Sequence, residues 1–176
     1  MLSYNVADLL RAAPGTVERN DVDVPSLPLD EGLVLARPIR GQVRLSNSGR
    51  GILVQARLET ALAEQCSRCL RPADAPLTLE VEEEALPSID LDSGLPVDTS
   101  AEPDVMRLTD HHELDLEPAL RDAISLAEPI APLCRPDCPG LCEVCGQDLA
   151  SDPGHAHAAE VDPRLADLAS LRERLE

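Results

Sequence analysis

The sequence contains no Phe, no Trp and no Lys, and Tyr4 is its only Tyr. A hydrophobic core must therefore be built from Leu, Val, Ile and Ala, which supply most of the 43% of residues that are hydrophobic. Because aromatic rings are nearly absent, the chain offers no platform on which unpaired bases could stack. Sequence-specific recognition of single-stranded nucleic acid is accordingly not expected.

Long hydrophobic runs are also missing. No stretch approaches the roughly 20 apolar residues that a membrane span requires, and the first residues lack the basic start and apolar run of a signal peptide. We therefore expect a cytoplasmic protein without a membrane partner. In that compartment, the six cysteines are more often metal ligands or redox groups than disulfides.

Charge is unevenly distributed along the chain, whose formal net charge is −18. Residues 80–117 hold thirteen acidic residues and one basic residue, and an arginine-rich stretch precedes them. That stretch comprises Arg37, Arg40, Arg44, Arg50, Arg57, Arg68 and Arg71. Guanidinium groups bind phosphates well, so these arginines are candidate RNA contacts, and the acidic stretch could attract a basic ribosomal protein. Both stretches are also compatible with ordinary solvated surface.

Alternation with period two predicts an antiparallel sheet in the first half of the chain. Strands are expected over residues 33–45, 52–62 and 77–82, with a turn at 47–51. The inward face of the second strand consists of Ile52, Val54, Ala56, Leu58, Thr60 and Leu62. The pair Cys66-Ser-Arg-Cys69 then falls in the turn of a β-hairpin.

Helices are expected before and after this sheet in the sequence. A short helix is predicted over residues 4–12, a second after Asp115 as its N-terminal cap, and a third after Asp162. A linker rich in Pro and Asp and an acidic loop over residues 83–112 separate the elements. The predicted fold class is α+β, an antiparallel sheet or partly open β-barrel with flanking helices and a zinc-ribbon-like cysteine cluster.

The predicted organisation has three parts. Residues 1–30 form an N-terminal helix and linker, and residues 31–130 form the sheet domain with its acidic loop and helix. Residues 131–176 form a cysteine-rich segment and a C-terminal helix that pack on the same domain.

Two Cys-x-x-Cys pairs indicate a structural metal, with zinc as the expected ion. A tetrahedral zinc site takes four ligands, often as two such pairs on tight turns. Cys66 and Cys69 form one pair, and Cys142 and Cys145 form the other. Gly146 follows the second pair and suits the positive φ that such turns need. These four cysteines would clamp the hairpin tip to the C-terminal segment.

Other ligand sets remain open. Cys134 and Cys138 make a compact alternative with Cys142 and Cys145, and a second site could draw on His155 and His157. The Cys66/Cys69 pair could also serve a thiol-disulfide oxidoreductase or redox sensor, but such motifs normally precede a helix, and here a strand is predicted. No phosphate loop and no Ser/His/Asp arrangement is evident, so we expect no enzyme and no small-molecule substrate.

A series of short motifs resembles the YceD family, known as large ribosomal RNA subunit accumulation proteins. The most specific is Cys66-Ser-Arg-Cys69-Leu-Arg-Pro. It follows Asn5-Val-Ala-Asp-Leu-Leu, Val34-Leu-Ala-Arg-Pro-Ile-Arg-Gly and Arg50-Gly-Ile-Leu-Val. It precedes Glu113-Leu-Asp-Leu, Pro132-Leu-Cys134, Asp137-Cys138-Pro-Gly-Leu-Cys142-Glu-Val-Cys145-Gly and Asp162-Pro-Arg-Leu-Ala.

The resemblance implies a role in ribosome assembly without catalysis. The expected partner is large-subunit pre-ribosomal RNA, a basic ribosomal protein, or both. Many similar family members carry Cys-x-Cys after the second cluster, where this chain has His155-Ala-His157. Exchange of one ligand type for another implies that this stretch can keep a metal-binding role.

Overall fold

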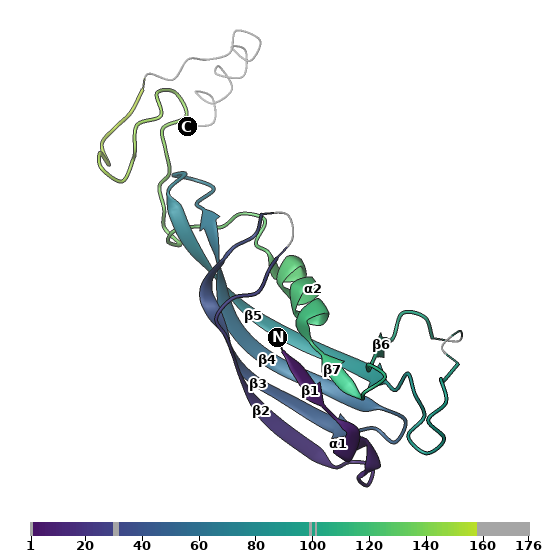
Figure 1. Ribbon diagram of the computed structural model, residues 1–176. Helices are drawn as coiled ribbons and strands as arrows, with labels where there is room; N and C mark the ends of the chain where they lie inside the picture. Colours follow the sequence, from purple (N-terminus) through teal and green to yellow (C-terminus); the bar gives the residue numbers. More distant parts are fainter. Residues whose placement is uncertain (1, 30–31, 99, 101, 158–176) are drawn as a thin grey trace, which may run out of the picture.

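The computed structural model describes residues 2–29, 32–98, 100 and 102–157. Its centre is a five-stranded sheet of order β2-β3-β4-β5-β6 (Figure 1). The strands are β2 (Val17–Val24), β3 (Leu35–Asn47), β4 (Ile52–Gln65), β5 (Pro72–Leu86) and β6 (Met106–Arg107). A small second sheet pairs β1 (Ser3–Asn5) with β7 (Glu113–Asp115). The helices are α1 (Ala7–Arg11) and α2 (Glu117–Ala127).

The long hairpin of β4 and β5 confirms the alternation in the sequence. The predicted inward residues of β4 are all buried, and so are Leu77, Leu79 and Val81 on β5. Thr78, Glu80 and Glu82 are exposed on the opposite face. Branched aliphatic residues at every second position favour this half-buried pleated surface.

The core lies between the inner face of the sheet and the helices. Its buried members are aliphatic, as the absence of Phe and Trp requires, and Leu9, Ile39, Leu58, Leu120 and Ile124 are almost fully enclosed. Helix α2 contributes Leu120 and Ile124 from one face. The N-cap residue of α2 is Leu116, which makes no side-chain capping bond, so the predicted cap at Asp115 is one residue too early. Asp115 accepts a hydrogen bond from the backbone N–H of Glu117 at 3.0 Å.

The predicted fold class is confirmed, with differences in detail. The sheet is mixed, because the short β6 runs parallel to β5. Within the described residues, the sheet does not close into a barrel: β2 and β6 are its two edges. The expected helix over residues 4–12 shortens to α1, because Ser3–Asn5 pairs with Glu113–Asp115 as a strand.

The prediction of a linker before the sheet is wrong for residues 17–24. Residues 17–24 form β2, which pairs antiparallel with β3 along its whole length. Only Val22 is buried in it, because an edge strand faces solvent broadly, so its residues lack a clear hydrophobic alternation. The expected helix after Asp162 lies outside the described residues. The division into 1–30, 31–130 and 131–176 stays a prediction.

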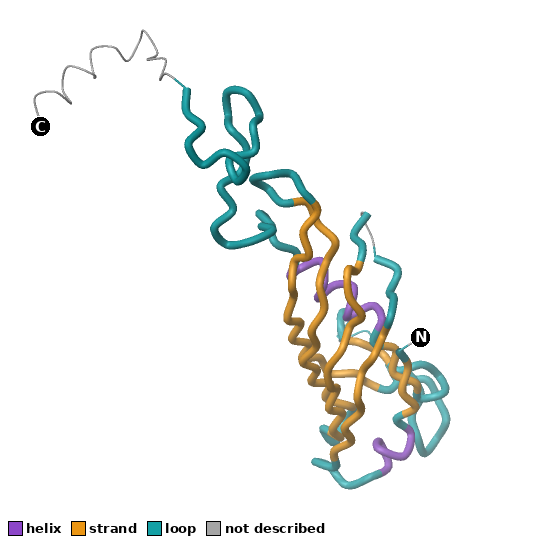
Figure 2. Tube along the Cα trace, turned by 90° about the vertical axis from the view of Figure 1, so that its left-hand side faces the viewer, coloured by secondary structure: helices purple, strands orange, loops and turns teal. Residues whose placement is uncertain are grey.

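The molecule is elongated along the β4–β5 hairpin. The cysteine-rich segment lies beyond the tip of this hairpin, at the opposite end from α1 (Figure 2). In the part of the chain that the structure describes, no helix has the length and apolar character to cross a bilayer.

Asn47 connects the sheet to α1. Its side-chain amide donates to the carbonyl oxygens of Leu9 (2.9 Å), Leu10 (3.1 Å) and Ala12 (3.0 Å), which end the helix. Its Oδ1 accepts from the N–H of Gly49 at 2.7 Å. The side chain is 6% exposed, so water cannot replace these bonds freely.

We predict that Asn47→Ala lowers the free energy of unfolding by about 2–3 kcal/mol, because it leaves buried carbonyl groups without donors. Urea denaturation measures the change. Gln42→Ala is the control, since Gln42 is exposed on the same strand and its loss should cost about 0.5 kcal/mol or less. Equal losses in the two variants would contradict the assigned role of Asn47.

Candidate metal centres

The tip of the β4–β5 hairpin carries the first group of donor atoms. Cys66 and Cys69 lie in the turn, and Cys134 and Cys138 come from the segment after α2. The four sulfur atoms lie within 4.8 Å of one another. Cys66 Sγ is 3.8 Å from Cys138 Sγ, and Cys69 Sγ is 3.7 Å from Cys134 Sγ.

These distances fit a tetrahedral thiolate site. Zinc–sulfur bonds of about 2.3 Å place the ligands of a tetrahedron about 3.8 Å apart. A disulfide would need about 2.05 Å, and all six cysteines are free thiols. The first group can therefore hold a metal ion in a Cys₄ arrangement.

The backbone of the turn presents both thiols to the same point. The N–H of Leu70 donates to the carbonyl of Cys66 at 2.9 Å, and the N–H of Cys66 donates to the carbonyl of Arg71 at 2.8 Å. Closing the turn in this way places Leu70 in the left-handed region, with φ of 59°. A residue with a Cβ adopts that conformation at a cost.

The second group consists of Cys142, Cys145, His155 and His157. Its turn repeats the first: the N–H of Gly146 donates to the carbonyl of Cys142, and the N–H of Cys142 donates to the carbonyl of Gln147, both at 2.8 Å. Gly146 occupies the position of Leu70, with φ of 72°. The two Cys-x-x-Cys pairs thus form matching knuckles.

The donor atoms of the second group are also close together. Cys145 Sγ lies 3.1 Å from His155 Nε2 and 3.3 Å from His157 Nε2, and the two Nε2 atoms are 2.9 Å apart. A tetrahedral Cys₂His₂ site has edges of about 3.3–3.8 Å, so these three donors need to separate by only a few tenths of an ångström around an ion. Two thiolates with two imidazoles are a donor set that suits zinc.

The segment that carries these donors has little else to hold it. Residues 129–157 contain no helix or strand, and only Cys138 and Gly140 are buried in them. Arg68, in the turn between β4 and β5, supplies much of the contact between the hairpin and this segment. Its guanidinium donates to the carbonyl of Cys138 at 2.8 Å, and its own carbonyl accepts from the N–H of Leu141 at 3.2 Å. The fold of this segment therefore depends on the donor groups rather than on a hydrophobic core.

Backbone hydrogen bonds prepare thiols of both knuckles for ligation, and the one from Arg71 lowers the pKa of Cys69. Those from Cys134 and Cys69 lower the pKa of Cys66 to about 6. Those from Cys145 and Val144 lower the pKa of Cys142 to about 6. Burial raises the pKa of the Cys138 thiol instead. At neutral pH each knuckle thus already favours a thiolate, which is the form that binds metal.

The structure divides the ligand set that the sequence favoured. Cys142 and Cys145 are not brought to Cys66 and Cys69: each pair belongs to a separate group of four. The reason is the order of the chain after α2. Residues 134–138 reach the hairpin tip first and complete its group, so the second knuckle lies beyond it. Three residues separate Cys134 from Cys138, whereas a knuckle has two between its cysteines. The spacing in the sequence therefore did not favour these two cysteines as ligands of the first group.

The redox alternative for Cys66 and Cys69 lacks two features that such sites use. Cys66 is fully buried and Cys69 is 5% exposed, so neither thiol is open to a substrate disulfide. The pair is followed by a turn and β5, not by a helix whose N-terminus would face the thiol.

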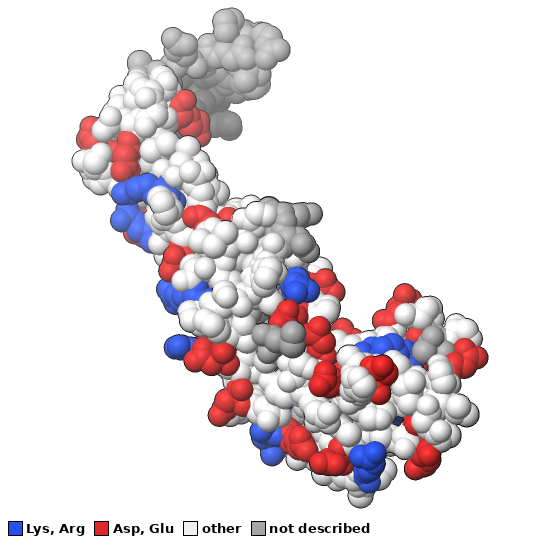
Figure 3. All heavy atoms as spheres, viewed as in Figure 1, with Lys and Arg blue, Asp and Glu red and all other residues white. Residues whose placement is uncertain are grey.

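Five of the seven arginines in the arginine-rich stretch form salt bridges with acidic side chains. Salt bridges join Arg37 to Asp74, Arg40 to Asp23 and Arg57 to Glu80, each at 3.3 Å. Further partners are Glu84 and Glu102 for Arg50, Asp148 for Arg71, and the side chain of Gln55 for Arg44. Figure 3 shows basic side chains (blue) interspersed with acidic ones (red) on the face in view. The RNA contacts of the seven arginines stay a prediction.

Comparison with known proteins identifies one matching family. A family model described as "Large ribosomal RNA subunit accumulation protein YceD" matches residues 54–172, which include both donor groups. Uncharacterized proteins of Mycobacterium tuberculosis and Mycobacterium bovis are each 36% identical to the chain over 146 residues.

These alignments cover 82% of this chain and 65% of each relative, so the chain spans just under two thirds of their length. An uncharacterized protein of Mycobacterium leprae is 31% identical over 163 residues, 90% of this chain and 72% of the relative. No solved structure matches the chain.

The matching knuckles predict opposite effects of two substitutions. Leu70→Gly should raise the free energy of unfolding of the zinc-loaded chain by about 0.5–1 kcal/mol, because it removes the left-handed strain. Leu70 is 54% exposed, so little buried area is lost. Gly146→Ala should lower it by about 1 kcal/mol, although an added Cβ would meet nothing within 4 Å. Denaturation of both variants checks this, and shifts of the same sign would refute the assignment.

Proposed function

The chain belongs to the YceD family, the large ribosomal RNA subunit accumulation proteins, and from this premise we propose that it is a binding factor, not an enzyme, in the accumulation of large-subunit ribosomal RNA. In this proposal it acts in the cytoplasm, holds two structural zinc ions, and binds large-subunit precursors through pre-ribosomal RNA or a basic ribosomal protein. The alternative role as a thiol-disulfide oxidoreductase or redox sensor is supported less well: the pKa of Cys66 is lowered to about 6, but the thiol is fully buried.

The observation that carries the structural role is the completeness of both donor groups. The first group supplies four thiolates, and the second supplies two thiolates and two imidazoles. Zinc with four protein ligands has no open position for water or substrate, whereas catalytic zinc keeps one. The donor sets therefore support ions that hold the fold.

The first ion would join segments far apart in the sequence. It would tie the turn between β4 and β5 to residues 134–138, and the second would close the loop between Cys142 and His157. Zinc binding by such sites supplies on the order of 10 kcal/mol of folding free energy. The result is a stiff extension of the hairpin, which suits a surface used for binding.

We predict two zinc ions per chain, with independent loss at each centre. Cys66→Ser should reduce the content from two to one, Cys142→Ser should do the same, and the double variant should hold none. Mass spectrometry of metal in the purified protein measures the content. A single site shared by Cys66, Cys69, Cys142 and Cys145 would instead hold one ion, and either substitution would remove it.

Controls for this experiment come from each knuckle. Ser67→Ala and Val144→Ala change exposed side chains between the cysteines of a pair and should keep both ions. An unchanged zinc content in Cys66→Ser or Cys142→Ser would contradict the assigned centres.

We predict that the protein sediments with precursors of the large subunit and that this association weakens as salt rises. Gradients of cell lysate at about 0.1 M and about 0.5 M salt would show it, with precursors of the small subunit as the control. Depletion of the protein should lower the ratio of large- to small-subunit ribosomal RNA. Recovery only in free fractions at both salt concentrations would refute the proposed function.

A further inference from the structure

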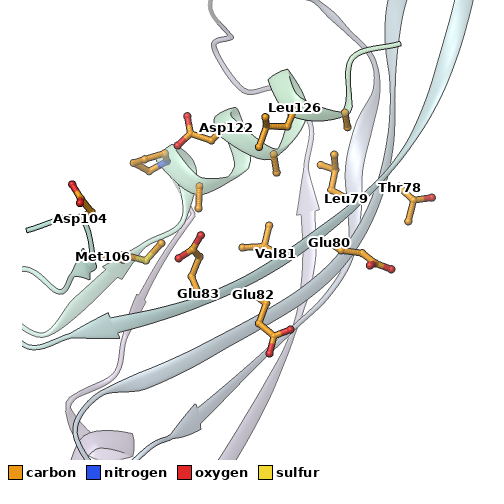
Figure 4. Close-up of a pocket in the computed structure, with 14 residues that line it drawn as sticks. Thr78, Leu79, Glu80, Val81, Glu82, Glu83, Asp104, Met106, Asp122 and Leu126 are labelled. Atoms are coloured by element: carbon orange, nitrogen blue, oxygen red, sulfur yellow. The ribbon is translucent and has the colours of Figure 1, made fainter. Parts of the chain in front are cut away.

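A groove of about 710 Å³ runs between α2 and the edge of β5 (Figure 4). Its lining includes six consecutive residues of β5, 78–83, whose side chains alternate between the two faces of the sheet. The groove therefore follows the edge of the strand. In Figure 4, Val81 and Glu83 point toward the helix, and Glu82 points to the other side.

The backbone along this edge has no strand beside it. β5 pairs with β4 from Pro72 to Ala85, but it pairs with β6 only at Ala85 and Leu86. In the described part of the chain, residues 72–84 have no strand on their outer side. Such an edge presents unpaired N–H and C=O groups to which an extended segment can add as a further strand.

Apolar side chains line the floor of the groove. Leu79 and Val81 are buried beneath it, and Met106 and Ala123 are half-buried at its sides. Leu126 on α2 is 88% exposed beside them. An added strand with aliphatic side chains on one face would cover this surface.

The charged residues that line the groove are all acidic. Its lining contains five carboxylates and no arginine: Glu80, Glu82, Glu83, Asp104 and Asp122. Glu80 pairs with Arg57, and Glu82 accepts a hydrogen bond from Gln55. Glu83, Asp104 and Asp122 are exposed and form no salt bridge within the described chain.

The negative charge of the groove determines which kind of molecule it can bind. Carboxylates on both sides of the groove repel the phosphates of RNA. A second copy of the chain is also disfavoured, because pairing of β5 with β5 would bring its glutamates together. A segment in which Arg or Lys alternates with aliphatic residues makes all three kinds of contact. Its backbone pairs with the strand edge, its aliphatic side chains cover the apolar floor, and its basic side chains face the carboxylates.

We propose that the outer edge of β5 binds an extended, cationic segment of a partner protein as an added strand, with basic side chains against Glu83, Asp104 and Asp122. This inference rests on the proposed function, in which a basic ribosomal protein is one of the two partners, and it identifies the surface that such a protein uses.

The test measures binding of a fluorescent peptide of about twelve alternating Arg and Val residues, long enough to span the strand. The full-length, zinc-loaded chain is compared with the triple variant Glu83→Gln/Asp104→Asn/Asp122→Asn. We expect about tenfold weaker binding by the variant, because three charge contacts are lost. The control variant Glu18→Gln/Glu64→Gln/Asp92→Asn changes the net charge equally, away from the groove, and should bind within about twofold of the unaltered chain.

Two further peptides separate strand addition from simple charge attraction. A peptide with Glu in place of Arg should not bind. An Arg–Val peptide that is N-methylated at alternate residues keeps its charge but lacks the donors for the strand edge, and should bind at least about fivefold more weakly.

Equal binding by the triple variant and the unaltered chain would overturn the proposal, and so would full binding of the N-methylated peptide. Binding of a single-stranded RNA that the triple variant loses would also overturn it. Because no ribosomal material is present, any of these results leaves the sedimentation with precursors standing. Failure of that sedimentation would likewise leave the peptide result intact.

Discussion

The antiparallel pairing of β4 with β5 is the interaction on which the rest of the structure depends. It is continuous from Ile52, opposite Ala85, to Gln65, opposite Pro72. One face of this ladder supplies much of the core, its tip carries the first knuckle, and its outer edge borders the groove beside α2. Three different surfaces thus derive their positions from a single hairpin.

The two ends of this hairpin are stabilised by different chemistry. Near α1 and α2, buried aliphatic side chains hold the strands and helices together, as the hydrophobic effect requires of a chain without large aromatics. Beyond the tip, apolar residues are too few to build a core, and cysteine and histidine side chains gather instead. Metal ligation is the established way for such short irregular segments to become rigid.

Local sequence patterns predicted secondary structure correctly where a single signal, such as hydrophobic alternation, was present and no other signal opposed it. The alternation of Leu77, Leu79 and Val81 predicted both the strand and its buried face, and Asp115 predicted a helix start that lies one residue later, at the N-cap Leu116. Residues 17–24 were missed because a solvated edge strand carries little hydrophobic signal. Their pairing partner on β3 decides their conformation, and no property of the segment itself shows this.

The sequence by itself determined the donor types, the two knuckles and the aliphatic core, because each follows from residue chemistry over a few positions. Only the tertiary structure decided that Cys134 and Cys138 complete the first group and that His155 and His157 complete the second. Ligand partners are chosen by distance in space, and the path of the chain from α2 to the hairpin tip sets that distance. The groove is likewise a tertiary feature, since neither β5 nor α2 alone contains it.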